Sequence, residues 1–121
     1  MTGKITNAGR DAIRDFIQSE VAEIGVGTGT TDPTKTNSSL ENEVESARKS
    51  VAEADAGTGE TVFEITLSTS DANYDDVGAE LTEVGTFDAD GDLQARITHS
   101  GIRKTSDFEV EYRLSETVVN T

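Results

Sequence analysis

The sequence contains no cysteine and no tryptophan, and it has one proline, one methionine and one histidine in 121 residues. Without cysteine, disulfide bonds and cysteine-based metal centres are excluded. No segment is apolar enough to predict a transmembrane helix, and the N-terminus does not resemble a signal peptide. We therefore expect a chain that begins near Met1 and that works, or is assembled, in the cytoplasm.

Apolar residues are also scarce. They make up 33% of the chain, and the aromatic residues are four phenylalanines and two tyrosines. This apolar share is below that of a usual globular domain, so we expect a thin core. The length suits one domain rather than two. We predict a single domain over residues 1–121 that draws part of its stability from neighbouring subunits.

Positive charge is the third scarcity. Ten lysines and arginines face 24 aspartates and glutamates, which gives a net charge of −14. Low hydrophobicity with high net charge is typical of disorder, but the periodic segments described below favour a folded chain. The acidity argues against nucleic acid and anionic membranes as partners, because both carry negative charge. It also suits molar salt, in which the Debye length is about 3 Å and carboxylate repulsion is screened.

Residues 6–20 have the pattern of an amphipathic helix. Four apolar residues recur at spacings of three and four, which places them on one face. They are Ala12, Ile13, Phe16 and Ile17. Thr6 or Asn7 can cap the helix. Two arrangements of the apolar stripe are expected: it packs on a sheet of the same chain, or it docks on another subunit.

A short strand is predicted around Ile24 and Val26, which alternate with glycines and lead into a polar loop at 28–39. The alternating glycines are Gly25, Gly27 and Gly29. A phosphate-binding loop would require a Lys-Ser/Thr pair that does not follow them. We interpret the glycines instead as positions of close backbone packing and tight turning.

The next two segments have weaker patterns. A short helix is predicted from Ser39 to about Lys49, because apolar residues share one face of it. The segment at 50–59 is small, acidic and contains glycine. We expect it to be an exposed and mobile connection.

The part of the chain at 60–119 is rich in strand patterns. Strands are predicted at 62–67, 81–87, 93–99 and 108–114, the last extending toward 119, with a turn of helix near Asn73. The predicted inward-facing residues are Phe63, Ile65 and Leu67, and then Phe108, Val110, Tyr112 and Leu114. Ile24 and Phe87 are expected in the same core. The fold class is α+β and mostly β: a small antiparallel β-sandwich or sheet with an N-terminal helix and a second short helix, the helices on one side.

The turn between the second and third of these strands is the one candidate site. Asp88, Asp90 and Asp92 flank a glycine, and alternate carboxylates can wrap a cation that prefers oxygen ligands. A weakly held Ca²⁺, Mg²⁺ or Na⁺ is one interpretation. The spacing does not match an EF-hand, and Asp-Gly is also the usual dipeptide of a hairpin turn. Both interpretations remain open.

No pattern in the chain indicates catalysis. His99 is the only histidine, and a zinc site around it would need carboxylates as the other ligands, which is uncommon. We interpret it as a polar residue at the end of a strand. Adjacent acids such as Asp75 and Asp76 carry little information in a chain this acidic. We expect a protein that is not an enzyme and has no cofactor.

Several motifs together resemble tail-fibre and baseplate-associated structural proteins of tailed phages. The matching segments are Ile5–Arg10, Ile24–Thr31, Leu40–Val44, Glu83–Gly91, Leu93–Arg96 and Lys104–Val110, in the order of that family. Two places depart from it: Thr86 stands where leucine is usual, and Ser46–Lys49 replaces a single arginine. The resemblance implies a component of a virus particle, and the acidity suggests a virus of haloarchaea.

The resulting expectation is a virion structural protein that is similar to a tail fibre, baseplate part or adaptor. Its expected partners are other virion proteins and copies of itself, with a trimer favoured by fibre symmetry. Its expected location is the virion, after assembly in the host cytoplasm. The alternatives are a capsid decoration, turret or spike protein, or an attachment module that binds a cation or a host surface glycan.

Overall fold

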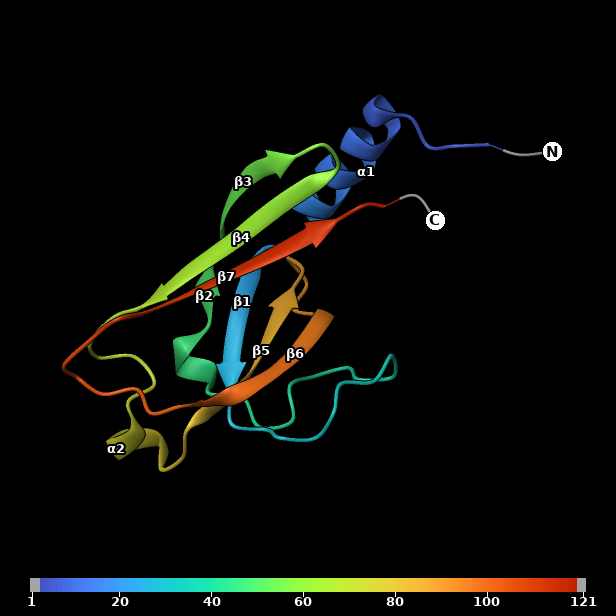
Figure 1. Ribbon diagram of the computed structural model, residues 1–121. Helices are drawn as coiled ribbons and strands as arrows, with labels where there is room; N and C mark the ends of the chain where they lie inside the picture. The colour runs from blue at the N-terminus through green and yellow to red at the C-terminus, as the bar shows by residue number, and fades with distance from the viewer. Residues whose placement is uncertain (1–2, 120–121) are drawn as a thin grey trace.

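The computed structural model describes residues 3–119 and shows an α+β fold made mostly of strands, as predicted (Figure 1). The elements are α1 (Asn7–Glu20), β1 (Glu23–Gly27), the 3₁₀ turn η1 (Glu45–Ala47), β2 (Lys49–Ser50), β3 (Ala52–Gly57), β4 (Glu60–Leu67), α2 (Tyr74–Val77), β5 (Leu81–Phe87), β6 (Leu93–Ile102) and β7 (Val110–Thr117). Neither α-helix within residues 3–119 combines the length and apolar character that crossing a membrane requires.

The strands form two antiparallel sheets that enclose the core. One sheet has the order β2-β1-β5-β6 and the other has the order β3-β4-β7. Apolar side chains from both sheets meet between them, and the fully covered ones include Ile24, Phe63, Leu67 and Leu81. The sequence suggested that the helices lie on one side of the sheet. In the structure they do not, because α1 lies at one end of the sandwich and α2 at the other (Figure 1).

The strand predictions from alternation are confirmed for the second half of the chain. In β4 every second residue is buried, and Phe63, Ile65 and Leu67 face the core as expected. β5 and β6 form the predicted hairpin, although β6 continues to Ile102 rather than ending at 99. Phe108 is the exception, because it lies before β7 and is 42% exposed instead of facing inward.

Two predictions for the middle of the chain are wrong. The expected helix from Ser39 to Lys49 is reduced to η1, because the backbone at 42–44 bonds to β1 instead of to itself. The Val44 N–H donates to the Val26 carbonyl, and the Thr28 N–H donates to the Asn42 carbonyl. The segment at 50–59 is largely exposed, as predicted, but most of it is the edge strand β3, paired with β4, rather than a mobile connection. Its pairing partner, rather than its own sequence, makes it a strand.

Glu83 fixes the base of the loop that follows β1. Its carboxylate accepts hydrogen bonds from the backbone N–H groups of Gly29, Glu41 and Asn42, and the donor–acceptor distances are 2.6, 2.8 and 2.9 Å. It also accepts one from Arg96 Nε at 2.9 Å. Both side chains are buried, with Glu83 0% and Arg96 2% exposed. Burial alone would raise the pKa of Glu83, but the guanidinium and the three N–H groups outweigh it and lower the pKa.

The alternating glycines allow this loop to lie directly on the outer face of β1. A Cβ at Gly27 would be 2.5 Å from the Asn42 carbonyl oxygen and 2.8 Å from Glu83 Oε2. A Cβ at Gly25 would be 2.9 Å from Glu43 Oε2. Real Cβ atoms do not approach a backbone oxygen this closely, so the position of Gly27 requires glycine, whereas at Gly25 the end of the Glu43 side chain would have to move. The interpretation of the glycines as positions of close packing is therefore confirmed.

Candidate interaction surface

Helix α1 begins where the sequence predicted and packs on the β3–β4 hairpin through its polar face. Thr6 caps it by accepting a hydrogen bond from the Gly9 N–H at 3.1 Å. Arg10 Nε donates to the carbonyl of Val118 at 2.9 Å. Arg14, which is only 8% exposed, donates to the carbonyls of Gly57 and Glu60. The N-terminal half of α1 is thus fixed by hydrogen bonds from its side chains to backbone groups.

Two more polar side chains complete the packing of α1. Asp11 accepts a hydrogen bond from the Gly59 N–H at 2.7 Å, and Gln18 donates to Thr61 Oγ1 at 2.7 Å. A hairpin turn has backbone N–H and C=O groups without ladder partners, and polar side chains satisfy them. This demand explains why the polar face of the helix, rather than the apolar one, is turned inward.

The apolar stripe of α1 is therefore turned mostly outward. Phe16 is 64% exposed and Ile13 is 40% exposed, and Ala12 is also exposed. Only Ile17 packs against the core, and it is partly buried. The expectation that the stripe packs on a sheet of the same chain is wrong except for Ile17. Its remaining residues form the helix patch, defined as Ala12, Ile13 and Phe16.

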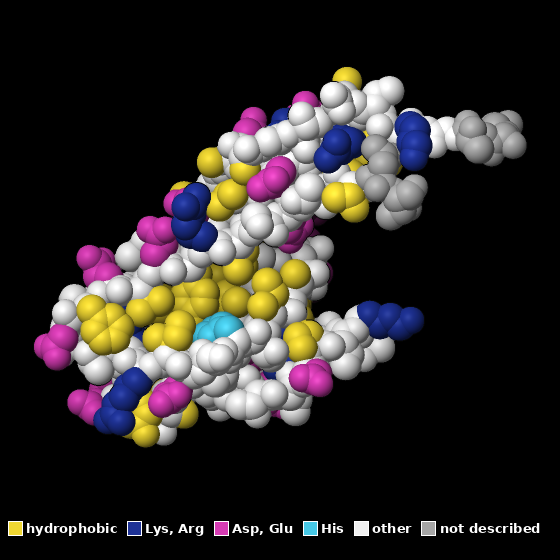
Figure 2. Space-filling view, viewed as in Figure 1, with side chains coloured by type: hydrophobic (Ala, Val, Ile, Leu, Met, Phe, Trp, Pro, Cys, Tyr) yellow, Lys and Arg dark blue, Asp and Glu magenta, His cyan; other side chains and the backbone are white. Residues whose placement is uncertain are grey.

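A second apolar surface lies on the side of the sandwich where β6 and β7 are the last strands. Ile97 of β6 is paired with Val84 of β5, so both side chains face the other sheet. Val84 is 1% exposed but Ile97 is 44% exposed. Figure 2 shows a hollow between the two layers on this side, with apolar side chains inside it and His99 (cyan) at its margin. We call this hollow between β6 and β7 the seam.

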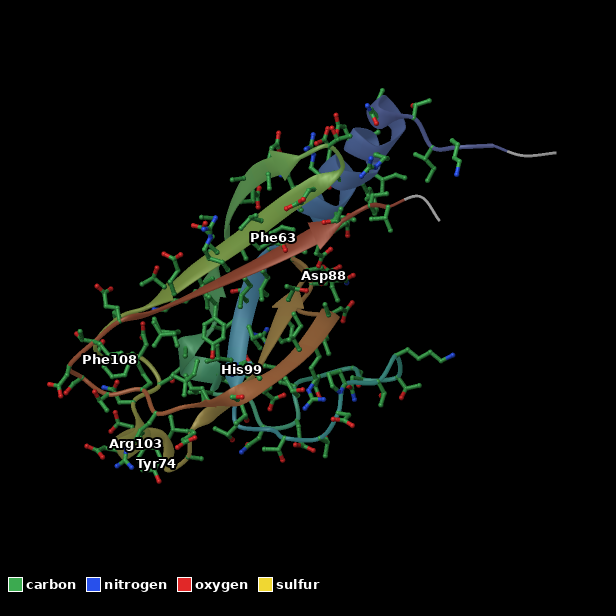
Figure 3. All side chains as sticks on the ribbon, in the orientation of Figure 1. Phe63, Tyr74, Asp88, His99, Arg103 and Phe108 are labelled. Carbon is green, nitrogen blue, oxygen red and sulfur yellow. The ribbon has the colours of Figure 1, made fainter. Side chains whose placement is uncertain are left out.

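His99 and Tyr112 connect the two sheets across the seam. His99 Nδ1 lies 2.8 Å from the Ser100 carbonyl oxygen, which can only accept, so Nδ1 carries the proton. Nε2 then accepts a hydrogen bond from the Tyr112 hydroxyl at 3.0 Å. Burial raises the pKa of Tyr112 to about 12, so it remains a donor. His99 lies within β6 rather than at a strand end, and its contacts indicate a structural role (Figure 3).

The seam reaches the helix patch at the α1 end. A cavity of about 140 Å³ opens there, and it is lined by Phe16, Ile17, Glu20, Val21, Gln94 and Glu116. Glu116 lies on the inner face of β7, because its register partner on β4 is the buried Thr61. Burial raises the pKa of Glu116. The surface is therefore apolar along its length and acidic where it meets the helix.

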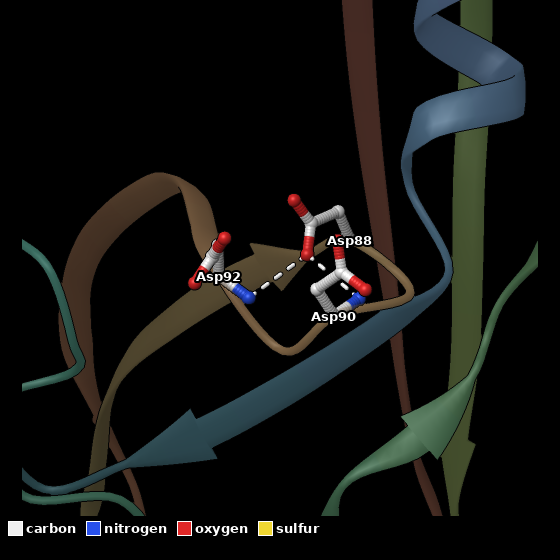
Figure 4. Close-up of side chains that lie close together, drawn as sticks. All are labelled: Asp88, Asp90 and Asp92. Atoms are coloured by element: carbon white, nitrogen blue, oxygen red, sulfur yellow. Dashed lines mark hydrogen bonds between the residues drawn. The ribbon is translucent and has the colours of Figure 1, made fainter.

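The aspartates predicted as a cation site lie together at the β5–β6 turn (Figure 4). One ligand oxygen from each of Asp88, Asp90 and Asp92 lies within 4.8 Å of the others. Both Asp88 oxygens already accept hydrogen bonds. Oδ1 accepts from the N–H groups of Asp90 and Asp92 at 3.0 and 2.9 Å, and Oδ2 accepts from Gln94 Nε2 at 3.0 Å. Gly91 follows in the left-handed region at φ 86°. Asp88 thus fixes the turn through these hydrogen bonds, and Asp90 and Asp92 are exposed.

This arrangement predicts different results for two substitutions in the turn. Asp88→Ala should lower the free energy of unfolding by about 1–2 kcal/mol, because three hydrogen bonds are lost. Asp90→Ala should leave it unchanged, because the Asp90 backbone N–H, not its side chain, makes the turn contact. Thermal unfolding of both variants and of the wild type, with and without calcium chloride, measures this. A calcium-dependent rise in Tm that Asp90→Ala abolishes would instead identify a cation site.

A polar pocket at the α2 end was not predicted from the sequence. It measures about 390 Å³ and is lined by Asn73, Asp75, Asp76, Arg103, Lys104, Thr105, Ser106 and Asp107. Lys104 is 1% exposed and donates to Asn73 Oδ1 at 2.8 Å and to the Thr105 carbonyl at 3.0 Å. Arg103 stacks on the Tyr74 ring at 4.0 Å, so this ring face is already covered and not free to stack on a sugar (Figure 3). These contacts hold α2 and the loop after β6 together.

Comparison of the chain with models of known protein families and with curated proteins finds no match.

Proposed function

We propose that this chain is a non-catalytic virion structural protein of a tailed virus, acting as a tail-fibre, baseplate or adaptor part. The helix patch is the observation that carries the proposal. Phe16 and Ile13 are held at the surface by the opposite face of α1, whose Arg10 and Arg14 bond to backbone carbonyls. An apolar stripe fixed outward in this way is typical of an interaction surface. Other virion proteins and further copies of the chain, with a trimer favoured, are its proposed partners.

The resemblance to phage tail proteins supports the proposal through two of its motifs. Leu40–Val44 and Glu83–Gly91 come together in the fold, since Glu83 binds the backbone of Glu41 and Asn42. The motifs therefore act as one structural unit that shapes the loop after β1, which extends away from the sheets (Figure 1). A unit that shapes a projecting loop suits a protein whose role is assembly.

The charge distribution supports a saline setting and a haloarchaeal host. Most basic side chains are used in contacts within the chain, among them the ion pairs Arg48–Glu43, Lys49–Asp71 and Arg96–Glu83. The net charge of −14 is thus carried mainly by surface carboxylates. Copies of such a chain associate more readily when salt screens their repulsion. We infer that self-association strengthens as salt rises toward molar concentration.

Removing the helix patch should abolish self-association. We expect the wild type to form oligomers in molar salt and the double variant Ile13→Ser with Phe16→Ser to be a folded monomer, because both side chains already lie at the surface. Size-exclusion chromatography with light scattering measures the mass. Phe108→Ser is the matched control, since Phe108 is also exposed but lies at the opposite end of the molecule (Figure 3).

The same proteins should be mixed with purified tails or virions of haloarchaeal tailed viruses and recovered by sedimentation. Binding by the wild type and by Phe108→Ser, but not by the double variant, supports the proposal. A wild-type chain that stays monomeric in molar salt and binds no particle would refute it.

A further inference from the structure

We propose that the seam receives one β-strand from a different protein of the particle, which pairs with the free edge of β7 and covers β6. This inference rests on the proposed function and names the second surface through which the chain assembles. The seam is built from β6 and β7. It meets the helix patch only at the α1 end, where Phe16 lines the cavity that both surfaces share.

The first argument is that the two sheets are unequal on one side. The sheet with β6 has four strands and the facing sheet has three. On the side of β2 and β3 the chain itself connects the layers, since these strands follow each other directly at Lys49–Ser50 and Ala52–Gly57. On the other side nothing within residues 3–119 pairs with β6 or β7 beyond their inner neighbours. Ile97 faces inward and is still 44% exposed, which is the expected result of an uncovered strand.

The second argument is that the edges on the two sides are protected differently. Exposed edges are normally protected by shortness, by charge, by lysine or proline, or by a bulge. β2 has two residues, and β3 carries Glu53 and Asp55 and a register shift between Asp55 and Gly57. β6 and β7 are longer, with ten and eight residues, and contain no lysine or proline. The side chains of β7 alternate between core and solvent, and of its charged residues Glu111 and Arg113 lie on the solvent side and Glu116 on the inner side. Such edges accept an added strand through main-chain hydrogen bonds.

The third argument concerns the chemistry of the incoming strand. The inner face of β7 presents Tyr112 and Leu114 and then Glu116, and β6 presents Ile97 opposite. The strand must therefore carry apolar residues at alternate positions. At the α1 end it meets Glu116 and Glu20, which line the same cavity, so a lysine or arginine there is favoured by charge. The long loop of this chain at 28–39 is polar and contains Pro33, so it does not supply a strand with alternating apolar residues. A more basic protein is the better match.

The test uses a synthetic peptide of about ten residues, a usual strand length, with alternating valine and threonine and a lysine at one end. Hydrogen exchange and amide NMR shifts of the full chain in molar salt give the readout. We expect new protection of alternate amides in β7 (Val110–Thr117) and shifts around Ile97. The same peptide with N-methylated alternate amides should not bind, because it cannot form the ladder.

Ile97→Lys is the diagnostic variant, and its partial exposure makes folding of the variant expected. It should weaken peptide binding at least about tenfold through lost apolar contact and like charge. Phe108→Ser should bind as the wild type does. Equal binding by Ile97→Lys, binding of the N-methylated peptide, or no binding of any peptide would overturn the proposal. So would a dimer of the free chain that protects the same β7 amides, because the occupant would then be a second copy.

The two proposals fail independently. Ile97→Lys should still self-associate through the helix patch, as seen by light scattering. Ile13→Ser, which leaves Phe16 and the rest of the cavity lining in place, should weaken self-association and still bind the peptide. If one variant loses only peptide binding and the other loses only self-association, the seam and the helix patch act separately.

Discussion

Replacing Glu83 by glutamine is expected to lower the free energy of unfolding by about 3–5 kcal/mol, the range measured when one member of a buried ion pair is removed. The Arg96 guanidinium would remain buried, at 2% side-chain exposure, without its carboxylate partner. The three backbone N–H groups of Gly29, Glu41 and Asn42 would compete for one amide oxygen. The substitution therefore disrupts the sheet and the loop together.

The matched control is Glu64→Gln. Glu64 pairs with Arg113 at 2.7 Å, but these side chains are 35% and 61% exposed. Solvent-exposed pairs contribute no more than about 1 kcal/mol, and molar salt reduces this further. Denaturant unfolding of both variants in molar salt gives the difference. Similar midpoints for the two variants would mean that the Glu83 contacts do not hold the loop.

The Glu83 contacts should also give the stability a pH dependence. The folded state lowers the pKa of Glu83 below its unfolded value. A depressed carboxyl pKa contributes stability that is fully present above the unfolded pKa and is lost as the pH falls through the folded pKa. We expect acid to destabilise the wild type more steeply than Glu83→Gln, which has no carboxyl group at this position. Unfolding curves recorded from neutral pH down to strongly acidic pH measure the two slopes.

The strands were predictable because alternation depends only on which residues face the core. Phe63, Ile65 and Leu67 alternate with polar residues in the sequence and are buried in the structure. The segment at 50–59 has no such signal, because β3 lies at an exposed edge and buries nothing. Its strand conformation comes from pairing with β4, which a local pattern cannot show.

The packing of α1 was not predictable from its apolar stripe. The apolar stripe shows which residues share one face of α1, but it does not show which face packs against the rest of the chain. The packing partner is a hairpin turn with polar backbone groups, and these bind the polar face. The small number of basic residues was a signal in the sequence that pointed to buried ion pairs. In a chain with ten basic residues, Arg14 and Arg96 are both buried and each binds a carboxylate. Glu83 itself is one of 24 acidic residues, and nothing in its local sequence distinguishes it.

Gly27→Ala is expected to lower the free energy of unfolding by about 1–3 kcal/mol, as overpacking of a tight site does. The added Cβ would lie 2.5 Å from the Asn42 carbonyl oxygen and 2.8 Å from Glu83 Oε2. Neither atom can move freely. The Asn42 carbonyl accepts from the Thr28 N–H at 2.9 Å, and Glu83 is held by Arg96. Relief of the contact therefore requires the loop to move away from β1.

Gly57→Ala is the control for the general effect of losing glycine. The nearest atom to a Cβ at Gly57 is 3.8 Å away, and its φ lies outside the left-handed region, as does that of Gly27. It should be neutral, or stabilising by up to about 1 kcal/mol through reduced entropy of the unfolded chain. Denaturant midpoints of the two variants give the comparison, and limited proteolysis should cleave Gly27→Ala within residues 28–39. Because Gly27→Ala and Glu83→Gln act on the same contact, their combined cost should be less than additive. Full additivity would mean that the glycine and the carboxylate stabilise the loop separately.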